Sequence, residues 1–135
     1  FYRVRERCRA HGARLLVSSR HPPSYWRAAD GVHLTAADLA AARTRPPLPL
    51  VAASCHDSSE LERAGALGCD FAVLGPVRAT PSHPQQPPLG WQRFAQQIAL
   101  TPVPVYALGG LQPAHLPQAA ACGAHGIAML RHAWR

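Results

Sequence analysis

The polar segment RATPSHPQQPPLG (78–90) is the longest connection between the apolar runs of this sequence, and it brings Thr80, Ser82 and His83 together. Two hydroxyls and an imidazole can donate hydrogen bonds to the oxygens of a diphosphate. Long connections in compact folds are usually functional or mobile, which favours a ligand-binding role. A proline-rich surface loop with incidental polar groups is the alternative.

Gly109 and Gly110 follow another apolar run directly and are themselves followed by a helix-like segment. Glycine lets backbone amides approach an anion closely, and the start of a helix adds partial positive charge. The pair therefore predicts an anion-binding turn. A tight turn between strand and helix, without a ligand, is the alternative.

Histidine is the third type of residue that could take part in binding or catalysis, and the chain has 8 histidines. His33, His56, His83 and Cys55 could converge on a metal ion, but no HxH or HxxxH pair is present, which favours hydrogen bonding over zinc binding. No Ser-His-Asp or Cys-His pattern for nucleophilic catalysis is present either. The histidines that we expect in solvent, on helices or loops, are His11, His21, His115, His125 and His132.

All 14 basic residues are arginine, and against 7 acidic residues they give a formal net charge of +7. Without lysine, a Schiff base or a P-loop lysine is excluded within this chain. The cluster Arg3, Arg5, Arg7 and Arg9 fits the solvated face of a helix or arm rather than a nucleic-acid patch. Since arginine can donate two hydrogen bonds to one phosphate, we expect a phosphorylated small molecule as the partner, and no nucleic acid.

The cysteines Cys8, Cys55, Cys69 and Cys122 lack CxxC spacing and are expected to be reduced core thiols in a cytoplasmic protein. No apolar run approaches the ~18 residues of a membrane span, so we expect no membrane partner. The first residues, FYRVRERCRAHG, lack the apolar segment of a signal peptide and an initiating methionine. These residues indicate that the sequence begins in the middle of a helix, so we expect the chain to be part of a larger protein.

Short apolar runs recur along the chain, each followed by a turn and helix-like residues. They are ARLLVSS (13–19), GVHLT (31–35), LVAASCH (50–56), FAVLGPV (71–77), VPVYALGG (103–110) and GIAML (126–130). Continuous rather than alternating apolar runs are expected of parallel strands that are covered on both faces.

The intervening segments carry helix signals. Asp57 and Glu60 form a capping pattern, and Trp91, Phe94, Ala95 and Ile98 repeat at helical spacing. The segment from Pro113 to Cys122 begins with proline and ends before Gly123, and SYWRAAD (24–30) is long enough for one or two turns. The repeated strand–helix unit predicts an α/β fold with right-handed crossovers.

A length of 135 residues favours one domain. A Rossmann fold would require GxGxxG after the first strand, and that motif is absent. Barrels that bind phosphate place the anion after their last two strands, where Gly109 and Gly110 lie. We therefore predict a (βα)8 TIM barrel over residues 1–135 that is partial, with six of eight strands and the N-terminal βα units missing. Its expected strand-end candidates are Ser18, Ser19, His33, Thr35, Ser54, His56, Pro76, Thr80, Ser82, His83, Gly109, Gly110 and Arg131.

Four segments together resemble the thiamine phosphate synthase and thiazole tautomerase superfamily: GVHLTAADL (31–39), GPVRATPSHP (75–84), YALGGL (106–111) and CGAHGIAML (122–130). The resemblance covers essentially the whole chain. The forms SCHDSSEL, SHP and PLGW are similar to the synthase-like domain that is fused behind a Nudix hydrolase. The resemblance implies an enzyme that joins hydroxymethylpyrimidine diphosphate to thiazole phosphate with the help of magnesium. The alternative is a non-catalytic domain that binds a phosphorylated ligand beside a fused Nudix (MutT-like) hydrolase.

The resemblance also implies roles for individual residues. His33 and Ser54 would contact the pyrimidine. Asp38, which we expect at a loop position after GVHLT (31–35), would hold magnesium. Thr80 and Ser82, with His83 beside them, would contact the diphosphate. The thiazole phosphate would be held by Gly109, Gly110 and the backbone of Met129, Leu130 and Arg131.

Several positions depart from the family pattern. Ser18-Ser19-Arg20 replaces an Asn-Asp pair, His83 replaces a lysine, and Arg131 replaces a serine. Pro76 stands where the tautomerase branch has a histidine, which disfavours tautomerase activity. The resemblance therefore implies a synthase with reduced activity.

Overall fold

The computed structural model describes residues 1–81 and 85–133, and it confirms the predicted alternation of strands and helices. The described strands form one parallel six-stranded sheet in the order β1-β2-β3-β4-β5-β6. They are β1 (Leu16–Ser18), β2 (Gly31–Leu34), β3 (Leu50–Cys55), β4 (Phe71–Leu74), β5 (Val105–Leu108) and β6 (Gly126–Ala128). Each predicted strand is present, but shorter than the apolar run that predicted it.

Helices separate consecutive strands. The α-helices are α1 (Tyr2–Ala10), α2 (Pro23–Ala28), α3 (Ala36–Ala41), α4 (Ser58–Leu67), α5 (Gly90–Ile98) and α6 (Leu116–Ala121). Two short 3-10 turns, η1 (Pro113–His115) and η2 (Arg131–Ala133), follow β5 and β6. Among the described residues, no helix has both the length and the apolar character needed to cross a membrane.

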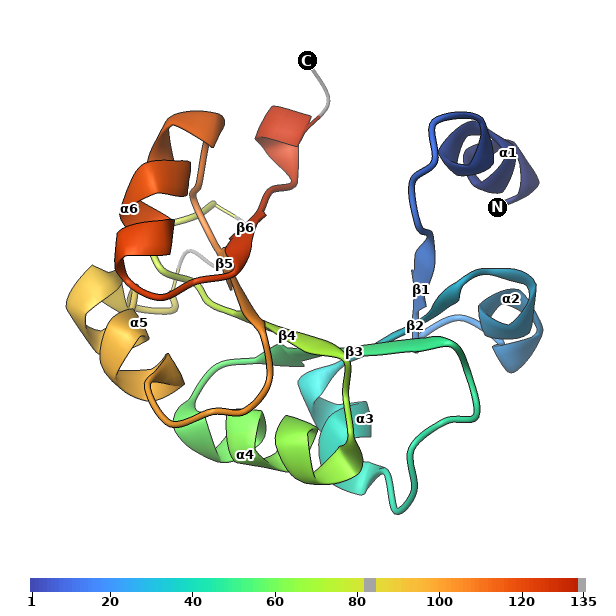
Figure 1. Cartoon of the computed structure of the whole chain (residues 1–135), viewed down its shortest axis with the longest axis horizontal. Coiled ribbons are helices and arrows are strands. Elements are labelled where there is room, and N and C mark those ends of the chain that lie inside the picture. Colours follow the sequence, from blue (N-terminus) through green and yellow to red (C-terminus); the bar gives the residue numbers. More distant parts are fainter. Residues whose placement is uncertain (82–84, 134–135) are drawn as a thin grey trace.

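The sheet curves into an open arc, and the helices α3 to α6 cover its outer face (Figure 1). Each strand pairs with its chain neighbours, so β1 and β6 are the two edges of the described sheet. This is the curvature of a (βα)8 barrel, with six of its strands in place. The prediction of a partial barrel is confirmed.

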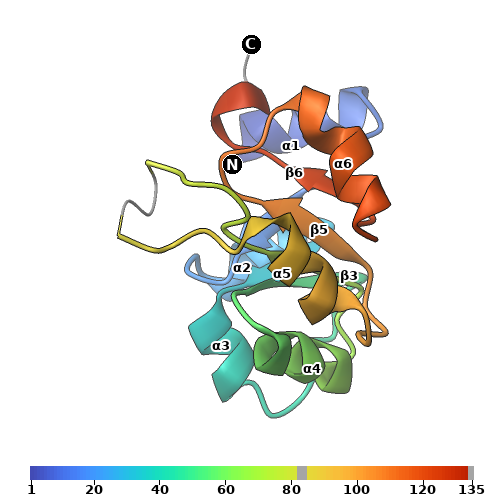
Figure 2. The same cartoon turned by 90° about the vertical axis from the view of Figure 1, so that its left-hand side faces the viewer.

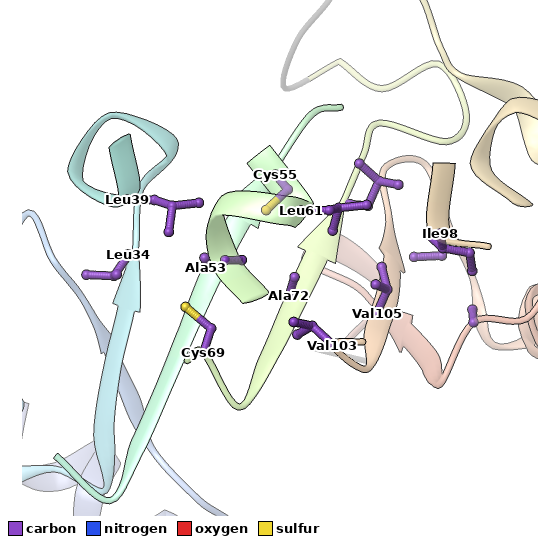
Figure 3. Packing of buried hydrophobic residues seen from close by; sticks show 14 of the residues in the cluster. Leu34, Leu39, Ala53, Cys55, Leu61, Cys69, Ala72, Ile98, Val103 and Val105 are labelled. Atoms are coloured by element: carbon purple, nitrogen blue, oxygen red, sulfur yellow. The ribbon is translucent and has the colours of Figure 1, made fainter. Parts of the chain in front are cut away.

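The core lies between the outer face of the sheet and the helices. Leu34, Ala53, Cys55, Ala72 and Val105 point from the strands toward Leu39, Leu61 and Ile98 of the helices (Figure 3). Phe94 of the predicted stripe on α5 is completely buried. Because side chains alternate along a strand, the residues between these core positions face the inside of the arc.

Local capping fixes where the helices begin. The Asp57 side chain accepts a hydrogen bond from the Glu60 amide, as the capping pattern predicted. The Glu60 carboxylate accepts a hydrogen bond from the His56 amide at 2.6 Å, rather than from the Asp57 amide. It also lies 3.0 Å from Nδ1 of the His56 ring. His56, at the end of β3, is therefore held in place by the first turn of α4.

Two surface predictions need correction. Arg5 is not fully solvated, because it is half-buried and donates to the Ala28 carbonyl at 3.2 Å. The four cysteines are free, but only Cys55 and Cys69 lie in the core, while Cys8 and Cys122 are partly exposed.

Candidate functional site

His33 and Ser54 meet on the inner face of the arc, as the resemblance implies. His33 lies between the core residues Val32 and Leu34, and Ser54 lies between Ala53 and Cys55. Both side chains therefore point away from the helices. The His33 Nε2 and Ser54 Oγ atoms are 2.9 Å apart.

Burial lowers the pKa of His33, because an imidazolium is poorly solvated there. The ring is therefore neutral at pH 7 and can share a single proton with Ser54. Since Ser54 can both donate and accept, the pair presents one donor and one acceptor to a ligand above it. Such a pair can recognise a heterocycle that carries ring nitrogens and an amino group.

Asp38 lies in the first turn of α3, whereas the sequence placed it in a loop. Its Oδ2 accepts hydrogen bonds from the Ser19 hydroxyl at 2.5 Å and the Thr35 hydroxyl at 2.7 Å. Thr35 caps the helix by accepting from the Asp38 amide, and the Thr35 amide donates to Ser19 Oγ at 3.0 Å. The reason for the difference is that Thr35 is a good N-cap and starts the helix directly after β2.

These hydrogen bonds lower the pKa of Asp38, that from Ser19 most and that from Thr35 next, and the charge of Arg20 adds to the effect. The Asp38 carboxylate therefore remains ionised well into the acidic range. Ser19 and Asp38 link the ends of β1 and β2 at the edge where the family is expected to bind magnesium.

The side chains at this edge fit magnesium only in part. Within residues 1–81 and 85–133, no three histidine, cysteine or acidic side chains are arranged so that they could hold a metal ion. Asp38 supplies one carboxylate and Ser19 one hydroxyl. Because magnesium is commonly held by one or two carboxylates together with substrate phosphates and water, this pair could hold it only beside a diphosphate.

Gly109 and Gly110 form the predicted turn after β5, both with positive φ, of 104° and 63°. The Arg78 amide donates to the Gly109 carbonyl at 3.1 Å. A Cβ at Gly109 would lie 2.5 Å from Pro76, and one at Gly110 would lie 2.5 Å from the Ala79 carbonyl oxygen. The turn therefore needs glycine both for its φ angles and for close contact with the segment that follows β4.

Met129, Leu130 and Arg131 follow β6 at the same edge of the sheet. Leu108 pairs with Ala128, so the glycine turn and Met129 leave two neighbouring strands at the same level. Leu130 is 64% exposed, and Arg131 is exposed at the start of η2. Leu130 and Arg131 are therefore exposed to solvent in the segment that follows β6.

Thr80 lies in the connection between β4 and α5, whose described parts project from one side of the molecule (Figure 2). Thr80 is half-buried and has an interaction partner. Ser82 and His83, which were expected to contact the diphosphate with it, lie outside the described residues. Their roles stay predictions.

Sequence reasoning missed two residues beside the glycine turn. His115, which was expected in solvent, is half-buried in η1, where its Nδ1 accepts from the Gln112 amide at 2.9 Å. Arg78 reaches the same ring, with its Nη1 3.2 Å from His115 Nε2. The two residues are 37 positions apart in sequence, in the segments that follow the paired strands β4 and β5, so no local sequence signal indicates their contact.

The chain matches one protein family over almost its whole length. Residues 1–133 match the family described as thiamine monophosphate synthase. The chain is 39% identical over 123 residues to a putative thiamine-phosphate synthase of Geobacter sulfurreducens, covering 88% of this chain and 58% of the relative. It is 34% identical over 126 residues to the thiamine-phosphate synthase of Parasynechococcus marenigrum, covering 91% of this chain and 36% of the relative.

The fold is also similar to that of a solved structure. Thiamine phosphate pyrophosphorylase from Pyrococcus furiosus superposes with a TM-score of 0.71 at 23% identity, over 93% of this chain and 61% of that chain. The present chain thus spans less than two thirds of the length of each of these three relatives. The family match over nearly the whole chain settles its relationship: the protein belongs to the thiamine monophosphate synthase family.

Proposed function

We propose that this chain supplies the pyrimidine- and phosphate-binding part of a thiamine phosphate synthase with reduced activity. The reaction would join hydroxymethylpyrimidine diphosphate to thiazole phosphate and release pyrophosphate. The observation that carries the proposal is the 2.9 Å contact of His33 Nε2 with Ser54 Oγ on the inner face of the sheet.

The pair of His33 and Ser54 would bind the aminopyrimidine through hydrogen bonds. Because His33 is buried and neutral, it can offer a proton or a lone pair without attracting the diphosphate. The diphosphate would then lie toward Asp38 and Thr80, which stand after β2 and β4 at the same edge. This division separates the ring from its charged leaving group.

Asp38, with Ser19, is the place where magnesium would be held in part. When bound, magnesium neutralises charge that develops on the departing pyrophosphate. Asp38 provides a single carboxylate, and Ser19 contributes a hydroxyl whose proton is already donated to Asp38. A weaker hold on the metal supports the proposal that activity is reduced.

Gly109, Gly110 and the backbone of Met129 to Arg131 would hold the thiazole phosphate. Two turns that leave neighbouring parallel strands at one level can direct amide groups at one anion. A closed eight-stranded barrel would need two βα units beyond the six strands described here, and we propose that they complete the pyrimidine side.

A second candidate function is a non-catalytic domain that binds a phosphorylated ligand, and the single carboxylate at Asp38 favours it. Fusion to a Nudix hydrolase would suit that role and stays a prediction. The two candidates differ in turnover, since both require the phosphate site but only the synthase requires a productive leaving-group site.

The test is a coupled assay for thiamine phosphate on the full natural chain, with calorimetry for thiazole phosphate. We expect slow turnover, which Ser54→Ala lowers by about tenfold or more because His33 loses its partner. Ser58→Ala on the exposed start of α4 is the matched control and should leave turnover unchanged. Binding of thiazole phosphate without any product would favour the second candidate, and no binding of either substrate would contradict the synthase.

A further inference from the structure

The side chains of Arg78 and His115 meet beside the glycine turn in a geometry that two such groups do not favour on their own. Arg78 Nη1 lies 3.2 Å from His115 Nε2. A guanidinium has donors only, so the contact is a hydrogen bond only if Nε2 carries a lone pair. Whether Nε2 carries a lone pair follows from the contact of the other ring nitrogen, Nδ1.

The proton on the His115 ring is assigned from its second contact. The Gln112 amide donates to Nδ1 at 2.9 Å, so Nδ1 carries the lone pair. In a neutral imidazole the single proton then lies on Nε2. Two N–H donors, Arg78 Nη1 and His115 Nε2, therefore face each other with no acceptor between them.

Within the described residues, neither Arg78 nor His115 forms an ion pair with an acidic side chain. All 7 acidic residues lie between Glu6 and Asp70, so the chain from β4 to its end has none. The described ion pairs of arginine engage Arg14 and Arg45, and not Arg78. Water or an anionic ligand can therefore supply an acceptor for the two donors.

The pair is fixed to the turn that is expected to bind phosphate. The Arg78 amide donates to the Gly109 carbonyl, and the Arg78 Cβ would lie 3.1 Å from a Cβ at Gly110. His115 follows the same turn in η1, where its Nδ1 contact holds the ring. Both side chains thus come from the two segments that frame Gly110.

We propose that Arg78 and His115 form an anion clamp that binds a phosphate group, with oxygens accepting from Arg78 Nη1 and His115 Nε2. A phosphate oxygen between them would replace the unfavourable contact of two donors by two charge-assisted or polar hydrogen bonds. The proposal deepens the proposed function, since the thiazole phosphate is the ligand group that would approach this turn. Free phosphate has the same chemistry, so it is a suitable probe.

The experiment is a titration of the protein with inorganic phosphate, followed through the ring nitrogen signals of histidine in long-range proton–nitrogen spectra. We expect the His115 signals to shift and saturate. Arg78→Gln should weaken phosphate binding by about tenfold or more, because one charge-assisted hydrogen bond is lost. His115→Asn should weaken it as well, since the amide oxygen can still accept from Gln112 but nothing replaces the Nε2 donor.

Arg93→Gln on the exposed face of α5 is the matched control, because it removes the same charge away from the turn. It should leave affinity within about twofold. Equal affinity of Arg78→Gln, His115→Asn and the unchanged protein would overturn the clamp. An equal loss in Arg93→Gln would also overturn it, by showing attraction to net charge alone.

A second titration with thiazole phosphate separates this proposal from the proposed function. Loss of thiazole phosphate affinity in both clamp variants supports both proposals. Binding of inorganic phosphate at the clamp, with no binding of thiazole phosphate, supports the clamp and contradicts the synthase. Thiazole phosphate binding that neither variant changes overturns the clamp and leaves the synthase standing.

Discussion

The Ser19 hydroxyl lies 2.5 Å from Oδ2 of Asp38 and joins the end of β1 to the start of α3. The family pattern expects a carboxylate in the segment that contains Ser19. In this chain Ser19 stands at that place and donates a hydrogen bond to the Asp38 carboxylate.

Ser19→Asp should therefore strengthen magnesium binding and lower the stability of the protein without metal. Two adjacent carboxylates repel each other, and Asp38 loses its donor, so the free energy of unfolding without metal should fall by roughly 1–3 kcal/mol. Magnesium at several times its dissociation constant should return about 1 kcal/mol. Urea denaturation with and without magnesium measures both effects.

Ser19→Asn is the control for Ser19→Asp, since it changes size and hydrogen bonding without adding charge. It should show little dependence on magnesium. If Ser19→Asp and Ser19→Asn respond equally to the metal, Ser19 does not lie at a magnesium site.

Gly110→Ala should destabilise the protein more than Gly12→Ala. The two glycines have nearly the same φ, of 63° and 64°, so the cost of the left-handed backbone is shared. A Cβ at Gly12 meets nothing within 4 Å, whereas one at Gly110 would lie 2.5 Å from the Ala79 carbonyl oxygen. We expect about 1 kcal/mol for Gly12→Ala and at least about 2 kcal/mol for Gly110→Ala.

Thermal and urea denaturation of the two glycine variants measure this difference. Equal destabilisation would show that the segment after β4 moves away freely. In that case the close contact of the glycine turn with Ala79 contributes nothing to stability.

The strands and most of the helices could be predicted because their signals are local. Continuous apolar runs mark buried parallel strands, and the capping residue Asp57 and the stripe that includes Phe94 mark two helices. The prediction that Asp38 lies in a loop was wrong, and the reason is also local. The N-cap Thr35 starts α3 immediately after β2. Boundaries depend on such short-range competition between turn and helix.

Only some of the side-chain contacts of the site could be predicted from the sequence. The contact between His33 and Ser54 follows from strand order, alternation and the family resemblance. The contact between Arg78 and His115 depends on the conformation of two loops, and no residue spacing indicates it. Loop contacts are set by three-dimensional packing, which the pattern of a single sequence does not contain.

Cys55 should be the least reactive thiol in the native protein. Burial, followed by the charge of Glu60, raises its pKa to about 12, so almost no thiolate is present at pH 8. Cys8 and Cys122 are partly exposed and should react first with a thiol reagent. Counting the thiols that react before and after denaturation measures this.

Cys55→Ala provides the check on that assignment. It should leave the number of rapidly reacting thiols in the native state unchanged and remove one thiol from the count in denaturant. A loss of one rapid thiol from the native protein would show that Cys55 is accessible.

The last prediction concerns the dependence of stability on pH. Burial lowers the pKa of His33 in the folded protein, so between that pKa and the usual value of about 6.5 the unfolded chain binds a proton that the folded chain does not. The contribution of a neutral, buried His33 to stability is therefore complete above pH 6.5 and is lost as the pH falls. His33→Gln removes this proton, and one proton limits the change in the free energy of unfolding to about 1.4 kcal/mol per pH unit.

Urea denaturation at pH 7.5 and pH 5.5 measures this effect. From pH 7.5 to pH 5.5, the free energy of unfolding should fall more in the unchanged protein than in His33→Gln. The exposed His21, changed to glutamine in the same way, controls for loss of an imidazole at the surface. An identical pH dependence for His33→Gln and the unchanged protein would contradict a buried neutral His33, and with it the donor and acceptor pair on which pyrimidine recognition depends.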